Sequence, residues 1–404
     1  MSKKRILMLS AGTPNQHNSG VGIACHHICN YLSKKSNLTI AQPSEIAELK
    51  PEEIKSTSEF SKKSIISIEK EIFSETIRHQ IDSSLSIYGY DTVTTKNKTE
   101  KVFEKSTIKK ELAIYTKEII ESVQNTSFDV IYAHDWISFQ AGIELKKRFN
   151  IPLVLHVHSL EYDRNPFYEN SWVYQLEKDA LEAADGILCV SSYSKNIIQE
   201  EYGINNSKIK TIHLGHILTN FPKAENPFPE QLVLFVGRLT NQKGTHNLLS
   251  IAEKVFAKNP KTRFMIAGDG DIYETIISAS AKSMVAENFH MTGYLEQDKL
   301  DQLYAMADVF CMPSLSEPFG LVALEAANAG LPMVLSENSG VSEIFSSANT
   351  VAPNDLDNFS KAILELLSNK KKSQQQIKKN KEVLTTLTWN STGNEILNFL
   401  TSRS

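Results

Sequence analysis

Short apolar stretches alternate with amphipathic ones along most of the 404-residue chain. The apolar stretches are rich in Val, Ile, Leu or Phe without a two-residue alternation, which is typical of parallel strands covered on both faces. They predict strands at Arg5–Leu9, Asp129–Ala133, Leu153–Val157, Gly186–Val190, Lys210–His213, Leu232–Val236, Arg263–Ala267, Asp308–Met312 and Met333–Leu335. Helical patterns lie between them, for example over Thr245–Lys258 and Leu321–Ala329. Repeated alternation of strand and helix predicts an α/β fold.

The alternating series divides at residues 221–229, FPKAENPFP, where three prolines disfavour both helix and strand. We therefore predict one α/β domain over residues 1–220 and a second over residues 221–388. Either is long enough to bury a core of its own. The last segment, residues 389–404, predicts a short amphipathic C-terminal helix.

Residues 43–125 are the least informative part of the chain. Lys, Ser, Glu and Ile dominate there, and helical periodicity occurs near Phe60–Ile81 and Ile108–Val123. We therefore expect a variable helical region. It is either an insertion that carries specificity or a solvated elaboration, and the sequence does not decide between the two.

Composition narrows the class of protein. Hydrophobic residues make up 41% of the chain, charged residues 22%, and the net charge is −4, so no basic field points to nucleic acid. The four cysteines, Cys25, Cys29, Cys189 and Cys311, are too few and too scattered for a disulfide framework, which favours the cytoplasm. The N-terminal apolar run is short and predicts a strand rather than a signal peptide. No apolar stretch approaches the ~20 residues that span a bilayer.

Two loops have the composition of phosphate-binding segments. Gly20 and Gly22 follow the first predicted strand and open a helix near Gly22, where backbone N–H groups could meet a phosphate. An isolated Gly-x-Gly serves equally often in a plain tight turn, and here it lacks the third glycine and the downstream acid of a dinucleotide site. Arg238 and Lys243 follow the first strand of the second half, where ligands bind in open α/β sheets. Such a cationic pair can neutralise a diphosphate, although a solvated loop also carries charges.

The segment Ser316–Glu325, SEPFGLVALE, is the most specific motif. It places Glu317 on a loop and Glu325 two turns into a helix, so that two carboxylates can address opposite ends of an extended ligand. Gly320, Leu321 and Val322 would offer N–H groups at the helix start. The alternative is that Glu317 caps the helix and Glu325 is solvated. Since apolar residues surround Glu325 in the sequence, we expect it to be buried and to have a partner.

Histidines mark two strand ends of the first half. His156 and His158 alternate along a predicted strand, which would place them on opposite faces, and the segment AHDW precedes them by one strand. A single histidine on a strand is more often a core residue whose hydrogen bonds are made within the protein. Histidines at two adjacent strand ends, however, favour a polar site that binds sugar. We expect no metal site: Cys25, His26, His27 and Cys29 have ligand chemistry, but on a helix they point in different directions.

Together these motifs resemble the GT-B glycosyltransferases of family four, and within it the bacterial glycogen/starch-synthase-like members. The resemblance is strongest over Asp129–Arg164 and Leu232–Phe345. It implies two Rossmann-like domains whose parallel sheets face each other across a cleft, with the N-terminal domain on the acceptor side. It also implies that the last helix returns to pack on the first domain, and that sugar is transferred with retention of configuration.

The resemblance also implies roles for individual residues, which we carry over as expectations. Arg238 and Lys243 would hold the diphosphate, and Gly320, Leu321 and Val322 would supply N–H groups. Glu317 would contact the donor sugar, His158 would approach that sugar near its 6-hydroxyl, and Gly20 and Gly22 would close over phosphate and sugar. Glu325 would contact the ribose, and Gly270 and Tyr294 would surround the base. The glycine loop lacks the lysine found in starch synthases. Glu325 is the residue usual in users of UDP-sugars, which favours UDP over ADP or GDP.

The sequence therefore predicts a cytoplasmic, retaining hexosyltransferase that moves glucose from a nucleotide sugar to a glucan-type carbohydrate, with no further cofactor. One alternative is transfer to a lipopolysaccharide, capsule or lipid acceptor. Another is a protein that is not a transferase: a Rossmann-type nucleotide-binding module or a nicotinamide-dependent oxidoreductase. The sequence leaves the oligomeric state open.

Overall fold

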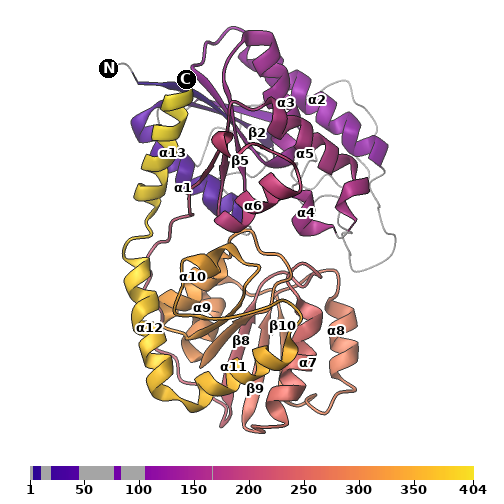
Figure 1. The fold of residues 1–404 in the computed structure, drawn as a ribbon, viewed down its shortest axis with the longest axis vertical. Coiled ribbons are helices and arrows are strands. Elements are labelled where there is room, and N and C mark those ends of the chain that lie inside the picture. The colour runs from indigo at the N-terminus through magenta and orange to yellow at the C-terminus, as the bar shows by residue number, and fades with distance from the viewer. Residues whose placement is uncertain (1–2, 11–19, 45–76, 83–104, 166) are drawn as a thin grey trace.

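The computed structural model describes residues 3–10, 20–44, 77–82, 105–165 and 167–404. Within these residues the chain forms two lobes, each built on a parallel β-sheet flanked by helices (Figure 1). The first lobe contains the earlier part of the chain, the second lobe contains the later part, and the last helix returns to the first lobe. The predicted α/β architecture with two parallel sheets is confirmed.

The sheet of the first lobe has the strand order β3-β2-β1-β4-β5-β6-β7, and all its neighbouring strands are parallel. The strands are β1 (Arg5–Leu9), β2 (Asn37–Ser44), β3 (Ile77–Asp82), β4 (Val130–His134), β5 (Leu153–Val157), β6 (Gly186–Cys189) and β7 (Ile209–Thr211). The helices are α1 (Gly20–Lys35), α2 (Lys105–Val123), α3 (Asp135–Phe149), α4 (Glu161–Arg164), α5 (Trp172–Ala183) and α6 (Ser192–Glu200), with the 3-10 turns η1 (Tyr168–Asn170) and η2 (Asn206–Lys208).

The sheet of the second lobe has the order β10-β9-β8-β11-β12-β13 and is also parallel. Its strands are β8 (Gln231–Val236), β9 (Thr262–Ala267), β10 (Phe289–Gly293), β11 (Val309–Met312), β12 (Met333–Ser336) and β13 (Asn349–Val351). Its helices are α7 (Thr245–Phe256), α8 (Tyr273–Ser280), α9 (Gln297–Met306), α10 (Leu321–Ala329), α11 (Leu356–Ser368) and α12 (Lys370–Leu384), with the 3-10 turn η3 (Gly340–Glu343).

Residues 212–230, which contain the proline-rich segment, connect β7 to β8 without helix or strand. The chain returns from α12 to the first lobe through α13 (Trp389–Arg403), which packs against α1. The Trp389 ring stacks on His27 of α1, with ring centroids 4.6 Å apart. A side chain at Gly393 would collide with the ring of Tyr31, so the two helices approach closely here.

The region 43–125 needs a correction, because it contains strand as well as helix. The predicted helix Ile108–Val123 lies within α2. Of the predicted helix Phe60–Ile81, residues 60–76 lie outside the described residues, and the last five belong to β3. There β3 pairs with β2 at the edge of the sheet, and this tertiary pairing overrides the local helical periodicity.

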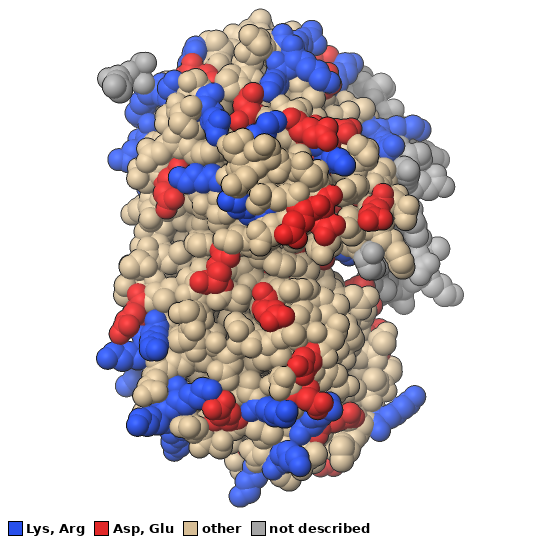
Figure 2. All heavy atoms as spheres, in the orientation of Figure 1, with Lys and Arg blue, Asp and Glu red and all other residues tan. Residues whose placement is uncertain are grey.

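No helix among the described residues is long and apolar enough to cross a membrane. On the face drawn in Figure 2, Lys and Arg side chains are interspersed with Asp and Glu over both lobes.

Candidate functional site

The predicted phosphate and base residues lie in three loops at the carboxyl ends of neighbouring strands. Arg238 and Lys243 follow β8, Gly270 follows β9, and Tyr294 follows β10. Arg238 and Lys243 are half-buried, whereas 57% of Tyr294 is exposed. All four residues therefore lie at the same edge of the second sheet.

Close backbone contacts fix these loops relative to one another. Leu239 N donates to Asp269 O (2.9 Å), and Gly268 N donates to Gly293 O (3.0 Å). Gly268 has a φ of +144°, and a side chain there would collide with the carbonyl oxygen of Gly237. Only glycine allows this approach, so the loops form one rigid edge.

Lys243 forms an ion pair with Glu317, the first acid of the SEPFGLVALE motif. Lys243 Nζ lies 2.5 Å from Glu317 Oε2, and the two side chains are 19% and 7% exposed. The loops that carry them follow β8 and β11, which are adjacent in the sheet. Glu317 does not cap the helix, because the N-cap residue of α10 is Gly320.

The start of α10 faces the start of α1 across the two lobes. Gly320 has a φ of +108° and has no side chain to cover the first N–H groups of α10, which begins at Leu321. A Cβ added to Gly20, the first residue of α1, would lie 3.7 Å from Leu321 Cδ1. The predicted glycine loop and the predicted N–H donors therefore meet. Gly22 is buried in α1, and Val322 is half-buried in α10.

Glu325, the second acid, has the partner that its apolar surroundings require. The Tyr304 hydroxyl of α9 donates to Glu325 Oε2 (2.9 Å). Burial raises the pKa of Glu325 to about 7, against the lowering effect of the Tyr304 hydrogen bond on that pKa. Hydrogen bonds from the hydroxyl groups of a ligand would favour the ionised form of a carboxyl group with this pKa.

Three buried histidines of the first lobe, His134, His156 and His158, lie side by side at the ends of β4 and β5. The prediction that His156 and His158 lie on opposite faces is wrong, because side chains two residues apart along an extended strand point to the same face. The two rings stack with centroids 4.2 Å apart. His156 Nδ1 lies 2.6 Å from the Tyr132 hydroxyl, inside the sheet. His158 is the less buried of the two, at 6% exposure, and lies beyond the end of the strand.

Asp135 is a candidate residue that the sequence reasoning did not single out. It is buried, with a φ of +53° that is uncommon for a residue other than glycine. Asp135 Oδ1 accepts a hydrogen bond from His158 N (2.7 Å), while Oδ2 finds no partner within the described part of the chain. Burial raises the pKa of Asp135 to about 7. A strained residue with an unsatisfied buried oxygen beside His158 indicates a binding role.

The residues on both sides of Glu317 are held by the first lobe. Ser316 Oγ donates to Asp163 Oδ1 (2.6 Å), and the Tyr193 hydroxyl lies 2.9 Å from the same Oγ. Ser191 Oγ donates to the carbonyl oxygen of Pro318 (2.6 Å). We call these contacts the lobe clasp; it joins the loop that carries Glu317 to the ends of β5 and β6.

Comparison with known proteins supports the expected family. Residues 102–218 match the sequence model of Glycosyltransferase Family 4, and residues 217–383 match that of Glycosyl transferases group 1. The chain belongs to glycosyltransferase family four. It is 30% identical over 267 residues to a glycogen synthase of Mycobacterium tuberculosis, and that match covers 64% of each protein.

Solved structures that resemble this chain include a sucrose-phosphate synthase of Thermosynechococcus elongatus, with a TM-score of 0.75 and 18% identity over 98% of each chain. Another is HepE of Anabaena in complex with UDP and glucose, with a TM-score of 0.70 and 15% identity over 99% of this chain and 100% of that one. At these identities the likeness concerns the fold, which is the two-lobed GT-B fold of the family.

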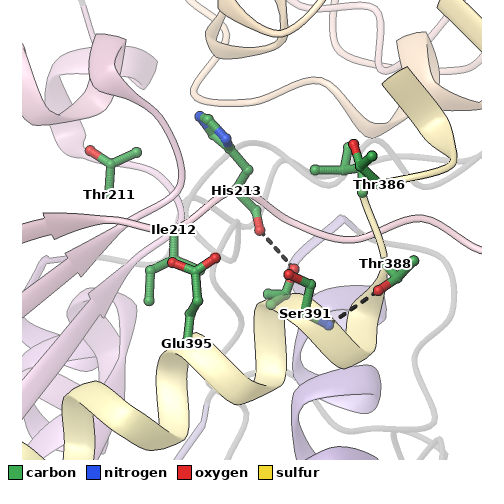
Figure 3. A pocket seen from close by; sticks show the side chains of 9 residues that line it. Thr211, Ile212, His213, Thr386, Thr388, Ser391 and Glu395 are labelled. Carbon is green, nitrogen blue, oxygen red and sulfur yellow. Dashed lines mark hydrogen bonds between the residues drawn. The ribbon is translucent and has the colours of Figure 1, made fainter. Parts of the chain in front are cut away.

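A small pocket lies where the chain crosses back to the first lobe, apart from the predicted site residues (Figure 3). Its volume is about 170 Å³, and its lining is mainly polar: Thr211, Ile212, His213, Thr386, Leu387, Thr388, Ser391, Thr392 and Glu395. Thr392 Oγ1 donates to His213 O (2.8 Å), and His213 Nε2 lies 2.5 Å from Glu343 Oε1 of the second lobe. This pocket therefore lies where the two crossing segments meet between the lobes.

Proposed function

We propose that this family-four protein is a retaining glycosyltransferase that moves glucose from UDP-glucose to a glucan-type acceptor. The observation that carries the proposal is the placement of a cation, an acid and a helix start at one point of the cleft. Lys243 and Glu317 come from loops after adjacent strands and form an ion pair, Gly320 packs close to Glu317, and Leu321, which follows Gly320, lies near the first residue of α1.

Departure of the nucleoside diphosphate is the step that most needs stabilisation by the protein. We assign this to Arg238, Lys243 and the N–H groups at the start of α10, namely those of Leu321 and Val322. In the structure, Lys243 is paired with Glu317. A phosphate that attracts Lys243 would leave the Glu317 carboxylate to accept hydrogen bonds from sugar hydroxyls.

The nucleoside would lie along the edge formed by Gly270 and Tyr294, with its ribose hydroxyls on Glu325. A carboxylate suits this role, because its two oxygens can accept hydrogen bonds from two neighbouring hydroxyl groups. The binding of UDP by HepE, whose fold this chain shares, supports UDP as the nucleotide.

The sugar would face the first lobe, where His158 and Asp135 offer polar atoms and the segment of Gly20 and Gly22 closes over it. The acceptor oxygen attacks the anomeric carbon from the face that the diphosphate leaves, and the departing phosphate oxygen takes the acceptor proton. We therefore assign no side chain as general base. The glycogen synthase relative supports a glucan acceptor.

The test is a panel of UDP-, ADP- and GDP-glucose, each with glycogen, with a lipid acceptor and with no acceptor. We expect UDP release to be fastest with UDP-glucose and glycogen, and proton NMR of the first product to show an α-linkage. Thermal shift with free UDP, ADP, GDP and NAD gives an independent readout, since a ligand at 100 times its Kd stabilises by about 2.7 kcal/mol. The proposal would be overturned if no donor gave transfer and neither UDP, ADP nor GDP raised the unfolding temperature.

A further inference from the structure

Three side chains with metal-ligand chemistry converge in the first lobe, although they are far apart in the sequence. Cys25 lies on α1, His134 ends β4, and His158 follows β5. Cys25 Sγ lies 3.6 Å from His134 Nδ1, which lies 3.0 Å from His158 Nε2. All three atoms lie within 4.8 Å of one another, and all three residues are buried. We propose that these residues bind a zinc-type divalent cation.

The spacing of the three atoms suits such an ion. Zinc binds sulfur at about 2.3 Å and imidazole nitrogen at about 2.0–2.1 Å, so a tetrahedral site separates N from S by about 3.6 Å and N from N by about 3.4 Å. The observed separations of 3.6 Å and 3.0 Å require only small side-chain movements. Thiolate and imidazole select zinc over magnesium or calcium, which prefer oxygen ligands.

Hydrogen bonding alone leaves the cluster incomplete. His134 Nδ1 approaches both Cys25 and His158, but one ring nitrogen has either one proton or one lone pair, so the contacts compete. A cation, in contrast, can accept a lone pair from all three ligand atoms at once.

A metal binds the neutral form of imidazole and the deprotonated form of a thiol. Ser10 Oγ donates a hydrogen bond to Cys25 Sγ (3.3 Å), and a bound dication itself displaces the thiol proton.

Binding at this site would regulate the transferase, a consequence that rests on the proposed function. The proposed function places His158 at the donor sugar, and a metal on His158 Nε2 would withdraw that atom from it. Zinc and the sugar donor should therefore compete, with three protein ligands on the metal and a fourth position open.

Cobalt(II) is the probe, because a cobalt–thiolate bond gives an intense near-ultraviolet charge-transfer band. We expect chelator-stripped protein to bind one Co²⁺ per chain with this band, and Zn²⁺ to bleach it. Cys25→Ser should lose the band, and His134→Gln should bind Co²⁺ at least tenfold more weakly. Cys29→Ser is the matched control: Cys29 lies one turn further along α1, is equally buried and contacts Met8 instead.

Absence of the band in the natural protein would overturn the site, and so would its equal loss in Cys25→Ser and Cys29→Ser. Thermal unfolding of each variant identifies one that has merely failed to fold, in which case His134→Gln decides. The competition is tested separately: Zn²⁺ should raise the KM for UDP-glucose at least tenfold in the natural protein but not in Cys25→Ser. Failure of all sugar transfer would refute the proposed function while leaving the cobalt result valid.

Discussion

Replacing Ser316 with alanine tests whether the lobe clasp positions the loop of Glu317. The serine hydroxyl donates to the buried Asp163 carboxyl across the lobes (2.6 Å) and meets the Tyr193 hydroxyl (2.9 Å). A hydrogen bond to such a charged group contributes about 1.5–3 kcal/mol. Because separation of the lobes would break this bond, its loss of about 2 kcal/mol should lower the ratio of closed to open protein about 30-fold.

The assay is kcat/KM for sugar transfer, with Ser314→Ala as the control. Ser314 lies two residues earlier on the same loop, is fully buried, and its hydroxyl has no hydrogen-bond partner among the residues that the structure describes. We expect Ser316→Ala to lower kcat/KM about 10- to 30-fold and Ser314→Ala to leave it unchanged. Small-angle scattering with UDP should show a larger radius of gyration for Ser316→Ala only. Equal kinetics in the two variants would refute a positioning role for the clasp.

Three further predictions concern the second lobe. Arg238→Ala should lower turnover about 10²- to 10³-fold, measured with saturating donor, because it removes a stabiliser of the leaving diphosphate; an unchanged kcat would exclude this role. Lys243→Met leaves the buried Glu317 carboxylate without its cation and should lower the free energy of unfolding by about 3 kcal/mol; adding Glu317→Gln should recover more than half of this in urea unfolding, whereas additive losses would contradict the coupling. The pKa of Glu325, raised by burial from 4.5 to about 7, means that the folded state keeps a proton which the unfolded state releases. The contribution of Glu325 to the free energy of unfolding should therefore fall by about 3 kcal/mol as pH rises from about 4.5 to 7. Asp135, whose pKa is also raised to about 7, contributes a fall of the same sign, so Glu325→Gln should reduce the slope between pH 5 and 8 in urea titrations without abolishing it.

The central strands of both sheets could be predicted from sequence because their burial on both faces leaves a continuous apolar run. The predictions for β1 and β5 match the structure residue for residue. Strands β2 and β3 were missed, and so were β10 and β13. In β10 (Phe289–Gly293) only the first residue is fully buried, so the segment presents no apolar run to recognise. Strands β3, β10 and β13 are edge strands, which gain their structure from one neighbour that local periodicity does not report. Strand β2 lies between β3 and β1, but Thr39 and Gln42 interrupt its apolar run.

In the candidate site, too, the sequence could identify single residues but not the contacts between them. Arg238, Lys243 and Glu317 could be named from sequence, because each lies a fixed number of residues after a predicted strand or before a predicted helix. The Lys243–Glu317 pair joins residues 74 positions apart, and the Ser316–Asp163 bond joins residues 153 apart. Such contacts depend on how the strands are ordered and how the lobes meet, and spacing along the chain contains neither.

Glu317 lies where contacts within the second lobe and contacts between the lobes come together. Its side chain holds Lys243 within the second lobe, while the neighbouring Ser316 and Pro318 are held by Asp163 and Ser191 of the first lobe. A movement of the first lobe therefore acts on the backbone on both sides of the acid that faces the cation. The geometry offered to a donor cannot be a property of the second lobe alone, even though all the predicted phosphate-binding cations lie there. Substitutions at the clasp in the first lobe should consequently alter the handling of the donor, and a second lobe prepared alone should bind UDP-glucose without cleaving the glucose from it.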